Sequence, residues 1–183
     1  MEFFKTGFVV MATALSACAG TVALKVPDGT SYYLGESAFF SPDGRLPYGK
    51  TDSAVKREIL AGGARIIETV TQPGAGPGVP PKTMVTELKR RGKKLVYDAS
   101  DAGGTFSGTL TYKDAGLTGW TYDLRLKNGG AIKGKGSVSA GGLKTEKQLT
   151  GGRPMLVKDE LKPVSEEKYN DEVRAMKPGY GAE

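Results

Sequence analysis

Apolar side chains alternate with polar ones along most of the middle of this 183-residue chain. Residues 117–127 show the pattern most clearly, because every second position is apolar: Trp120, Tyr122, Leu124 and Leu126. A period of two residues is typical of a β-strand with one face buried and the other in water. Glycine-containing turns interrupt the alternation about every 8–12 residues, which is the spacing of an all-β barrel or sandwich.

The alternation and its breaks predict ten strands, at residues 31–40, 53–61, 64–72, 82–90, 93–99, 105–113, 117–127, 131–139, 143–150 and 153–158. Nearly all of them are joined by tight turns, so they form an antiparallel meander. Closing a meander into a barrel removes its unpaired edges. We therefore expect an all-β fold, an antiparallel meander of about ten strands closed into a barrel over residues 31–160. The Gly- and Pro-rich stretch 73–81 is a longer loop, expected to cover one open end.

A different periodicity marks the C-terminal part of the chain, residues 161–183. Ser165 can act as a helix N-cap, and the two glutamates that follow it suit the positive end of a helix dipole. Tyr169, Val173 and Met176 then fall on one face. We predict one short helix that packs on the barrel wall or plugs one end. Binding of a partner protein is the alternative use of this apolar face.

Strand register can be tested by which side chains it sends to the core, because a one-residue slip reverses every side chain. Three-residue turns on either side of strand 117–127 keep Trp120 and Tyr122 inside the barrel. They place Tyr122 between Gly108 and Gly136 of the neighbouring strands. Either the ring covers bare glycine backbone, or the glycines leave room for a ligand beside Tyr122.

Charged side chains also fall on the inward face of the predicted barrel. Arg57 pairs with Glu68 across a hairpin, which gives each buried charge a partner. Lys147 falls opposite Gly136, and Tyr97 faces inward from another hairpin. The charges are either an ion pair at one end of the barrel, with a lysine that reaches solvent, or polar anchors inside a cavity.

The composition of the chain limits which catalytic, metal-binding and haem-binding chemistries are available to it. The chain has a net charge of +6, no His and a single Cys, Cys18. This excludes the Ser-His-Asp triad, the Cys-His pair and the usual zinc and haem ligands. We expect no enzyme, no cofactor and no metal site; a hydrolase or isomerase that uses carboxylates such as Glu68 and Asp98 is the remaining catalytic option. The basic run at 89–94 is interpreted as a solvated turn and not as a nucleic-acid site.

The N-terminal segment has an organisation of its own. One lysine precedes an apolar run over residues 7–15, which is too short to span a bilayer. The motif Leu15-Ser16-Ala17-Cys18 follows it and resembles the lipobox of bacterial lipoproteins. That resemblance implies cleavage before Cys18 and a diacylglycerol on its sulfur. The membrane is then one partner of the protein, through this lipid.

The same resemblance divides the chain. Residues 1–17 become a signal peptide, and residues 18–30 become a lipidated tether ahead of the barrel domain. Ala19, directly after the cysteine, is similar to the outer-membrane sorting pattern of Gram-negative lipoproteins. This implies a location in the cell envelope, at the outer membrane and facing the periplasm.

Residues 31–158 resemble the calycin barrel, the lipocalin-like architecture, in strand number, turn order and placement of aromatic residues. Calycins commonly hold small apolar ligands inside the barrel, so the resemblance implies a ligand of that kind. The chain departs from the lipocalin pattern, whose Gly-x-Trp signature lies near the first strand, because its single Trp lies late, in Gly119-Trp120. It also lacks the His that haem-binding members use. The ligand's identity does not follow from the resemblance.

Together these features predict a membrane-anchored lipoprotein whose barrel binds an apolar or amphipathic, lipid-like small molecule. The alternative is a structural or interaction lipoprotein of the cell envelope, with a packed barrel and no ligand. The candidate ligand-binding residues are Arg57, Glu68, Tyr97, Gly108, Trp120, Tyr122, Gly136 and Lys147.

Overall fold

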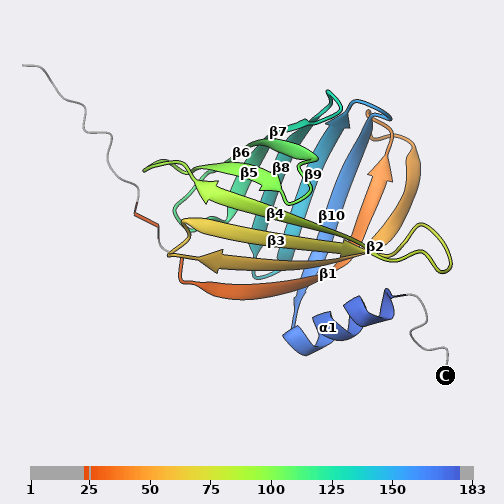
Figure 1. The fold of residues 1–183 in the computed structure, drawn as a ribbon, viewed down its shortest axis with the longest axis horizontal. Coiled ribbons are helices and arrows are strands. Elements are labelled where there is room, and N and C mark those ends of the chain that lie inside the picture. Colours follow the sequence, from red (N-terminus) through yellow and green to blue (C-terminus); the bar gives the residue numbers. More distant parts are fainter. Residues whose placement is uncertain (1–22, 25, 178–183) are drawn as a thin grey trace, which may run out of the picture.

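Ten strands and one helix make up the part of the chain that the computed structural model describes, residues 23–24 and 26–177. The elements are β1 (Gly29–Phe40), β2 (Pro47–Leu60), β3 (Arg65–Gln72), β4 (Lys82–Arg90), β5 (Val96–Asp101), β6 (Phe106–Tyr112), β7 (Gly119–Leu126), β8 (Ala131–Ser139), β9 (Gly142–Thr150), β10 (Met155–Val164) and α1 (Glu166–Ala175). Each strand pairs antiparallel with its sequence neighbours, and β10 pairs with β1, which closes the barrel (Figure 1). The predicted all-β fold, a closed antiparallel meander with one C-terminal helix, is confirmed.

The barrel has two ends that we name by what they contain. The closed end carries the turns β2–β3, β4–β5, β6–β7 and β8–β9, and the open end carries the other connections. At the closed end, the Asp28 carboxylate accepts hydrogen bonds from the backbone N–H groups of Ala61 and Gly62. Leu24 and Val26 pack against the core. The described part of the predicted tether is therefore docked on the closed end of the barrel.

Large side chains fill the closed half of the barrel. Tyr97, Tyr112 and Trp120 form an aromatic group, with ring centroids 4.9 Å apart for the two tyrosines and 5.6 Å apart for Tyr112 and Trp120. Tilted and edge-on aromatic pairs of this kind add about 0.5–1.5 kcal/mol beyond the burial of their area. Fully enclosed aliphatic side chains of the same half are Ile66, Leu88 and Leu110. This half is a packed hydrophobic core.

Inward and outward faces follow the predicted alternation, and hairpin β2–β3 has the predicted register. Arg57 pairs with Glu68 across this hairpin. Two strands are longer than the alternation predicts, because β2 begins at Pro47 and β10 runs to Val164. The sheet thus continues past residue 160, where the barrel was expected to end.

Other predicted hairpins differ from the structure by an even number of residues in register. Tyr122 pairs with Leu110 and Gly134, so the prediction that it lies between Gly108 and Gly136 is wrong. An even shift keeps each side chain on its predicted face and changes only its partners. The new inward pairs include Gly136 with Trp120, Gly108 with Leu124, and Gly134 with Lys147.

Turns centred on other residues than expected explain these shifts. Between β6 and β7, the Asp114 carboxylate accepts hydrogen bonds from the backbone N–H groups of Gly116 and Thr118, which stabilises a loop longer than the three residues predicted. Between β7 and β8, the N–H of Leu126 donates to the carbonyl oxygen of Gly130, so this turn stays short and its centre moves by one residue.

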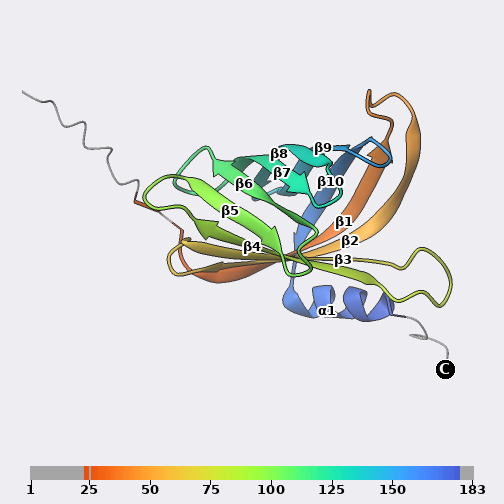
Figure 2. The ribbon, with the colours of Figure 1, turned by 45° about the horizontal axis from the view of Figure 1, so that its top comes forward.

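The helix α1 packs on the outside of the barrel, against β1 and β2 (Figures 1 and 2). The Ser165 hydroxyl accepts a hydrogen bond from the N–H of Lys168, as expected of an N-cap. Tyr169 is buried with its ring centroid 5.1 Å from that of Tyr32, and the outward-facing Ala54 is fully covered. The helix therefore covers the wall and plugs neither end. No helix among the described residues is long and apolar enough to cross a bilayer.

The loop 73–81 lies at the open end, as expected, but projects beyond the ends of β3 and β4 (Figures 1 and 2). Residues 75–80 are exposed, and the Val79 side chain is 46% accessible. The loop closes mainly on itself, since the N–H of Val79 donates to the carbonyl oxygen of Gly76. The expectation that it covers the open end is not met.

The packing around Gly136 can be tested by adding one methyl group. A Cβ at Gly136 would overlap the Trp120 indole, so we expect Gly136→Ala to lower the free energy of unfolding by about 1–3 kcal/mol. Gly76→Ala is the control, because nothing lies within 4 Å of the position that its Cβ would take. Urea denaturation followed by the fluorescence of the single Trp measures both variants. Equal stability of the two would contradict the contact between Trp120 and Gly136.

Candidate ligand-binding cavity

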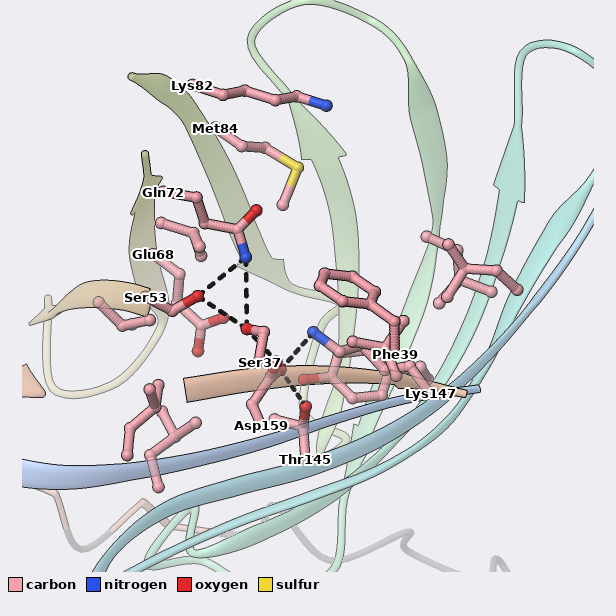
Figure 3. Close-up of a pocket in the computed structure, with 18 of the residues that line it drawn as sticks. Ser37, Phe39, Ser53, Glu68, Gln72, Lys82, Met84, Thr145, Lys147 and Asp159 are labelled. Carbon is pink, nitrogen blue, oxygen red and sulfur yellow. Dashed lines mark hydrogen bonds and ion pairs between the residues drawn. The ribbon is translucent and has the colours of Figure 1, made fainter. Parts of the chain in front are cut away.

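The open half of the barrel holds a cavity of about 240 Å³ (Figure 3). Side chains from eight of the ten strands surround it, and only β5 and β6 contribute none. Its apolar lining residues are Phe39, Val55, Val70, Met84, Trp120, Tyr122, Ile132, Leu143, Leu149, Val157 and Leu161. Its polar and charged lining residues are Ser37, Ser53, Glu68, Gln72, Lys82, Thr145, Lys147 and Asp159. The cavity therefore combines a large apolar surface with a defined set of polar groups.

Short side chains explain why this half of the barrel is not filled. The closed half places Tyr and Trp rings on the axis, whereas many inward positions of the open half carry Ser, Thr or Val. Ser37, Ser53 and Val157 are examples on three of the strands. Side chains of this length do not reach across a barrel, so they leave space that larger residues would occupy.

One hydrogen-bonded network runs across the cavity wall on β1, β2 and β3. The Ser37 and Ser53 hydroxyls lie 2.7 Å apart, and the Gln72 amide nitrogen donates to both, at 3.3 Å and 2.8 Å (Figure 3). The Ser37 hydroxyl in turn donates to the Asp159 carboxylate on β10, at 2.6 Å. These residues hold one another in place, so the wall is preorganised.

Asp159 is the centre of this network. Its carboxylate lies 2.7 Å from the Lys147 ammonium and also accepts a hydrogen bond from the Thr145 hydroxyl. Burial by itself would raise the pKa of Asp159, but Lys147 and the hydroxyls of Ser37 and Thr145 outweigh it and hold this pKa below its usual value. Asp159 is therefore ionised at neutral pH, and its charge is matched by Lys147.

A second matched pair lies where the cavity meets the packed half. The Arg57 side chain is only 3% exposed; its Nε lies 3.5 Å from the Glu68 carboxylate, and its Nη2 donates to the Tyr112 hydroxyl at 2.8 Å. Its guanidinium carbon lies 4.8 Å from the centroid of the Trp120 ring, a cation–π contact. Burial opposes the charge on Arg57, but Tyr112 and Glu68 outweigh it and raise the Arg57 pKa. Burial likewise raises the pKa of Tyr112, which stays a neutral phenol.

Glu68 Oε1 has no hydrogen-bond partner within the described part of the chain, although the carboxylate is ion-paired with Arg57. This oxygen is enclosed, while the Glu68 side chain as a whole is 15% exposed and lines the cavity. Arg57 Nε and Trp120 Nε1 are likewise enclosed without a hydrogen-bond partner. Buried polar groups in folded proteins are nearly always satisfied, so Glu68 retains capacity to accept a hydrogen bond from something else.

The structure brings part of the predicted site together. Glu68, Trp120, Tyr122 and Lys147 line the cavity, and Arg57 lies directly behind Glu68. Burial raises the pKa of Tyr122 well above its usual value, so its hydroxyl also stays protonated. These inward charges therefore lie at or directly behind the cavity, and that they hold a ligand stays a prediction.

Three predicted residues lie elsewhere. Tyr97 is buried in the closed half, where its hydroxyl donates to the carbonyl oxygen of Gly63 at 2.6 Å. The space beside Gly136 is taken by the Trp120 indole, and that beside Gly108 by the backbone of β7. The glycines therefore allow close packing and do not leave room for a ligand. Open space comes from short side chains instead.

Several lining residues did not emerge from the sequence. Ser37, Ser53 and Gln72 lie on predicted strands with the correct parity, but nothing in their spacing marks them as a cluster. Asp159 lies one residue beyond the predicted last strand, 153–158, so its inward direction was missed. Extending the alternation of that strand by one residue would have found it.

The carboxylate pair considered for catalysis does not meet. Glu68 faces the interior, whereas Asp98 lies on the outside and pairs with Arg91. No group of three or more His, Cys, Asp or Glu side chains that could hold a metal ion occurs in the residues that the structure describes. The cavity itself offers binding groups: two ion pairs, four hydroxyl or amide side chains and an apolar lining.

Comparison with family models, with curated proteins and with solved structures found no match.

The pairing of Asp159 predicts a specific pH dependence. A carboxyl group whose pKa is lower in the folded than in the unfolded state stabilises the fold above the unfolded pKa of about 3.9, and this contribution is lost as the pH falls through the folded pKa. Asp159→Asn should therefore be less stable than wild type at pH 7, and the difference should shrink as the pH is lowered towards about 2. Urea denaturation at several pH values measures it. An Asp123→Asn control, on the exposed face of β7, should follow the wild-type curve.

Proposed function

We propose that this protein is a lipid-anchored protein of the cell envelope whose barrel binds an apolar or amphipathic small molecule in its open half. The observation that carries the proposal is the half-filled interior. Aromatic side chains pack the closed half, and a cavity of about 240 Å³ with an apolar lining and preorganised polar groups occupies the other. Apolar pockets with a few placed polar groups are the usual form of small-molecule sites.

The energetics favour a partly apolar occupant. Each Å² of apolar surface that a ligand removes from water stabilises the complex by about 25 cal/mol. Water in the cavity can bond to the polar wall but gains nothing from Ile132, Leu143 or Val157. A molecule with a hydrocarbon part and a small polar part satisfies both surfaces.

The alternative proposal, an interaction lipoprotein with a packed barrel, accounts for less of the structure. It requires an interior that is filled throughout, and the open half holds a cavity instead. Its support is the apolar exposure of two loops at the open end, where Leu46 is 64% and Val79 46% accessible. We therefore keep it second.

The proposed lipid anchor is Cys18, which lies outside the described residues. The first described residues, near Leu24, lie at the closed end, and the six peptide units from Cys18 to Leu24 span at most about 20 Å. A lipid on Cys18 would then tie the closed end to the bilayer and leave the open end facing the other way. An outer-membrane anchor, proposed from Ala19, would turn the open end towards the periplasm.

The anchor is tested by removing its sulfur. We expect Cys18→Ser to abolish lipid attachment, because the hydroxyl does not replace the thiol in the modification, and to move the protein from the membrane to the soluble fraction. Cell fractionation and intact mass measure the two effects. Ser16→Ala keeps the cysteine and replaces one small residue of the motif with another, so this control should remain lipidated. A Cys18→Ser protein that stays in the membrane fraction, and whose mass differs from that of wild type only by the substitution, would refute the anchor.

The cavity is tested by filling it. The soluble domain, residues 23–183, should bind the fluorescent apolar probe N-phenyl-1-naphthylamine with enhanced emission. Leu149→Trp places a larger ring in the cavity, and we expect it to weaken probe binding by about tenfold or more, equivalent to about 1.4 kcal/mol. Gln148→Trp, on the neighbouring outward-facing position, is the matched control and should bind as wild type does. Native mass spectrometry of freshly extracted protein should show a co-purifying small molecule.

A further inference from the structure

We infer that the molecule bound in the cavity has an uncharged polar head, such as a hydroxyl or an amide, and that it is not a fatty acid or another anion. The inference rests on the proposed function, since it names the class of ligand for the same cavity. It is carried by the way the inward charges are already paired.

The charges around the cavity balance within the wall. Arg57 is matched by Glu68 at 3.5 Å, and Lys147 is matched by Asp159 at 2.7 Å. Arg57 is further occupied by the Tyr112 hydroxyl and the Trp120 ring. A bound anion would have to compete with Glu68 or Asp159 for these cations, and a bound cation would have to compete with Arg57 or Lys147 for these carboxylates.

A carboxylate or phosphate head would therefore lose its hydration and meet only cations whose charge a carboxylate of the wall already matches. Removing a charge from water is costly unless that charge is both paired and hydrogen-bonded in the site. Breaking the pair between Lys147 and Asp159 does not help, because it leaves the Asp159 carboxylate without its partner. Placing a negative charge inside this cavity is therefore unfavourable whether the pair stays intact or is broken.

The unfilled hydrogen-bonding capacity of the wall is of both kinds. Among the described residues, Glu68 Oε1 is an enclosed acceptor without a partner, and Arg57 Nε and Trp120 Nε1 are enclosed donors without one. Gln72 uses its amide nitrogen to donate to Ser53 and Ser37, which leaves its carbonyl oxygen for other partners. A hydroxyl or an amide both donates and accepts, so it can meet either kind of group, whereas a carboxylate has only acceptors.

Lys82 is a cavity-lining cation outside these two pairs. It lies on the exposed rim of the cavity, at the start of β4 (Figure 3). An anionic amphiphile with its head at Lys82, which pairs across the strands with Gln72, would place hydrocarbon against Glu68, deeper in the cavity. Covering this acceptor without a hydrogen bond is costly, because the bonds that it makes to water are lost. The geometry thus disfavours this orientation as well.

The test compares three amphiphiles of equal chain length by displacement of N-phenyl-1-naphthylamine from the soluble domain at pH 7.5: decanol, decanoate and decylammonium. We expect decanol to displace the probe at a concentration about tenfold or more below that needed for either charged compound. Equal or better displacement by decanoate would overturn the inference while supporting the proposed function. Failure of the probe and of all three compounds to bind would overturn the proposed function itself.

A variant that removes one of the paired charges is expected to reverse the preference for decanol over decanoate. Glu68→Gln keeps the shape of the side chain but leaves Arg57 unmatched, so decanoate should now bind better than decanol. Glu87→Gln removes a carboxylate from the outer face of the barrel, where it pairs with Arg65, and should keep the wild-type order. An unchanged preference in a folded Glu68→Gln protein would overturn the inference.

A measurement on the wild type covers the case in which Glu68→Gln does not fold. Decanoate binding should appear as the pH falls below about 5, where the acid becomes neutral, while decanol binding stays constant. Decanoate becomes neutral at a higher pH than Asp159 does, because the pKa of Asp159 lies below its usual value. Decanoate affinity that is independent of pH would contradict an uncharged head.

Discussion

The interior of this barrel depends on how one buried cation is satisfied. Arg57 is almost wholly enclosed, and it contacts Glu68, the Tyr112 hydroxyl and the face of Trp120 at once. Below it, towards the closed end, rings and branched aliphatic side chains fill the space. Above it, short side chains leave the cavity. The charge stays buried only because its partners come from both halves, so Arg57 marks the boundary between core and cavity.

The same principle shapes the cavity wall. Asp159 is ionised within a partly enclosed space because Lys147 and two hydroxyls stabilise its charge. Five strands contribute to the network that includes Ser37, Ser53 and Gln72, and all of them meet only when β10 returns to β1. Barrel closure and assembly of the polar wall are therefore one event. A ligand would meet a surface whose charges are already balanced, which is why we propose an uncharged head.

In the proposed function, the two ends of the barrel have different roles. Asp28 and Leu24 fasten the entering chain to the closed end, next to the packed core. The cavity lies at the other end, so an anchor and a binding site would not compete for the same surface. The helix α1 takes part in neither, because Tyr169 seals the outer wall over β1 and β2.

The sequence alone determined the fold class and the face of the inward residues on the predicted strands, whereas Asp159 lies beyond the predicted end of the last strand. Strict alternation sets which side a residue takes, and a barrel with one buried face tolerates only that parity. Ser165 likewise marked the start of the helix, since its capping role is local. The register of Arg57 with Glu68 followed too, because the turn between them is tight.

Only the tertiary structure decided which residues meet. Parity is unchanged by a two-residue shift, so alternation could not separate Gly136 from Gly134 as the partner of Lys147; the position of the tight turn between β8 and β9, where Ser139 pairs with Gly142, made that choice. Ser37 and Asp159 are far apart in the chain and meet by closure of β10 on β1. Whether the interior is filled also depends on summed side-chain volumes across all strands, which no single strand pattern contains.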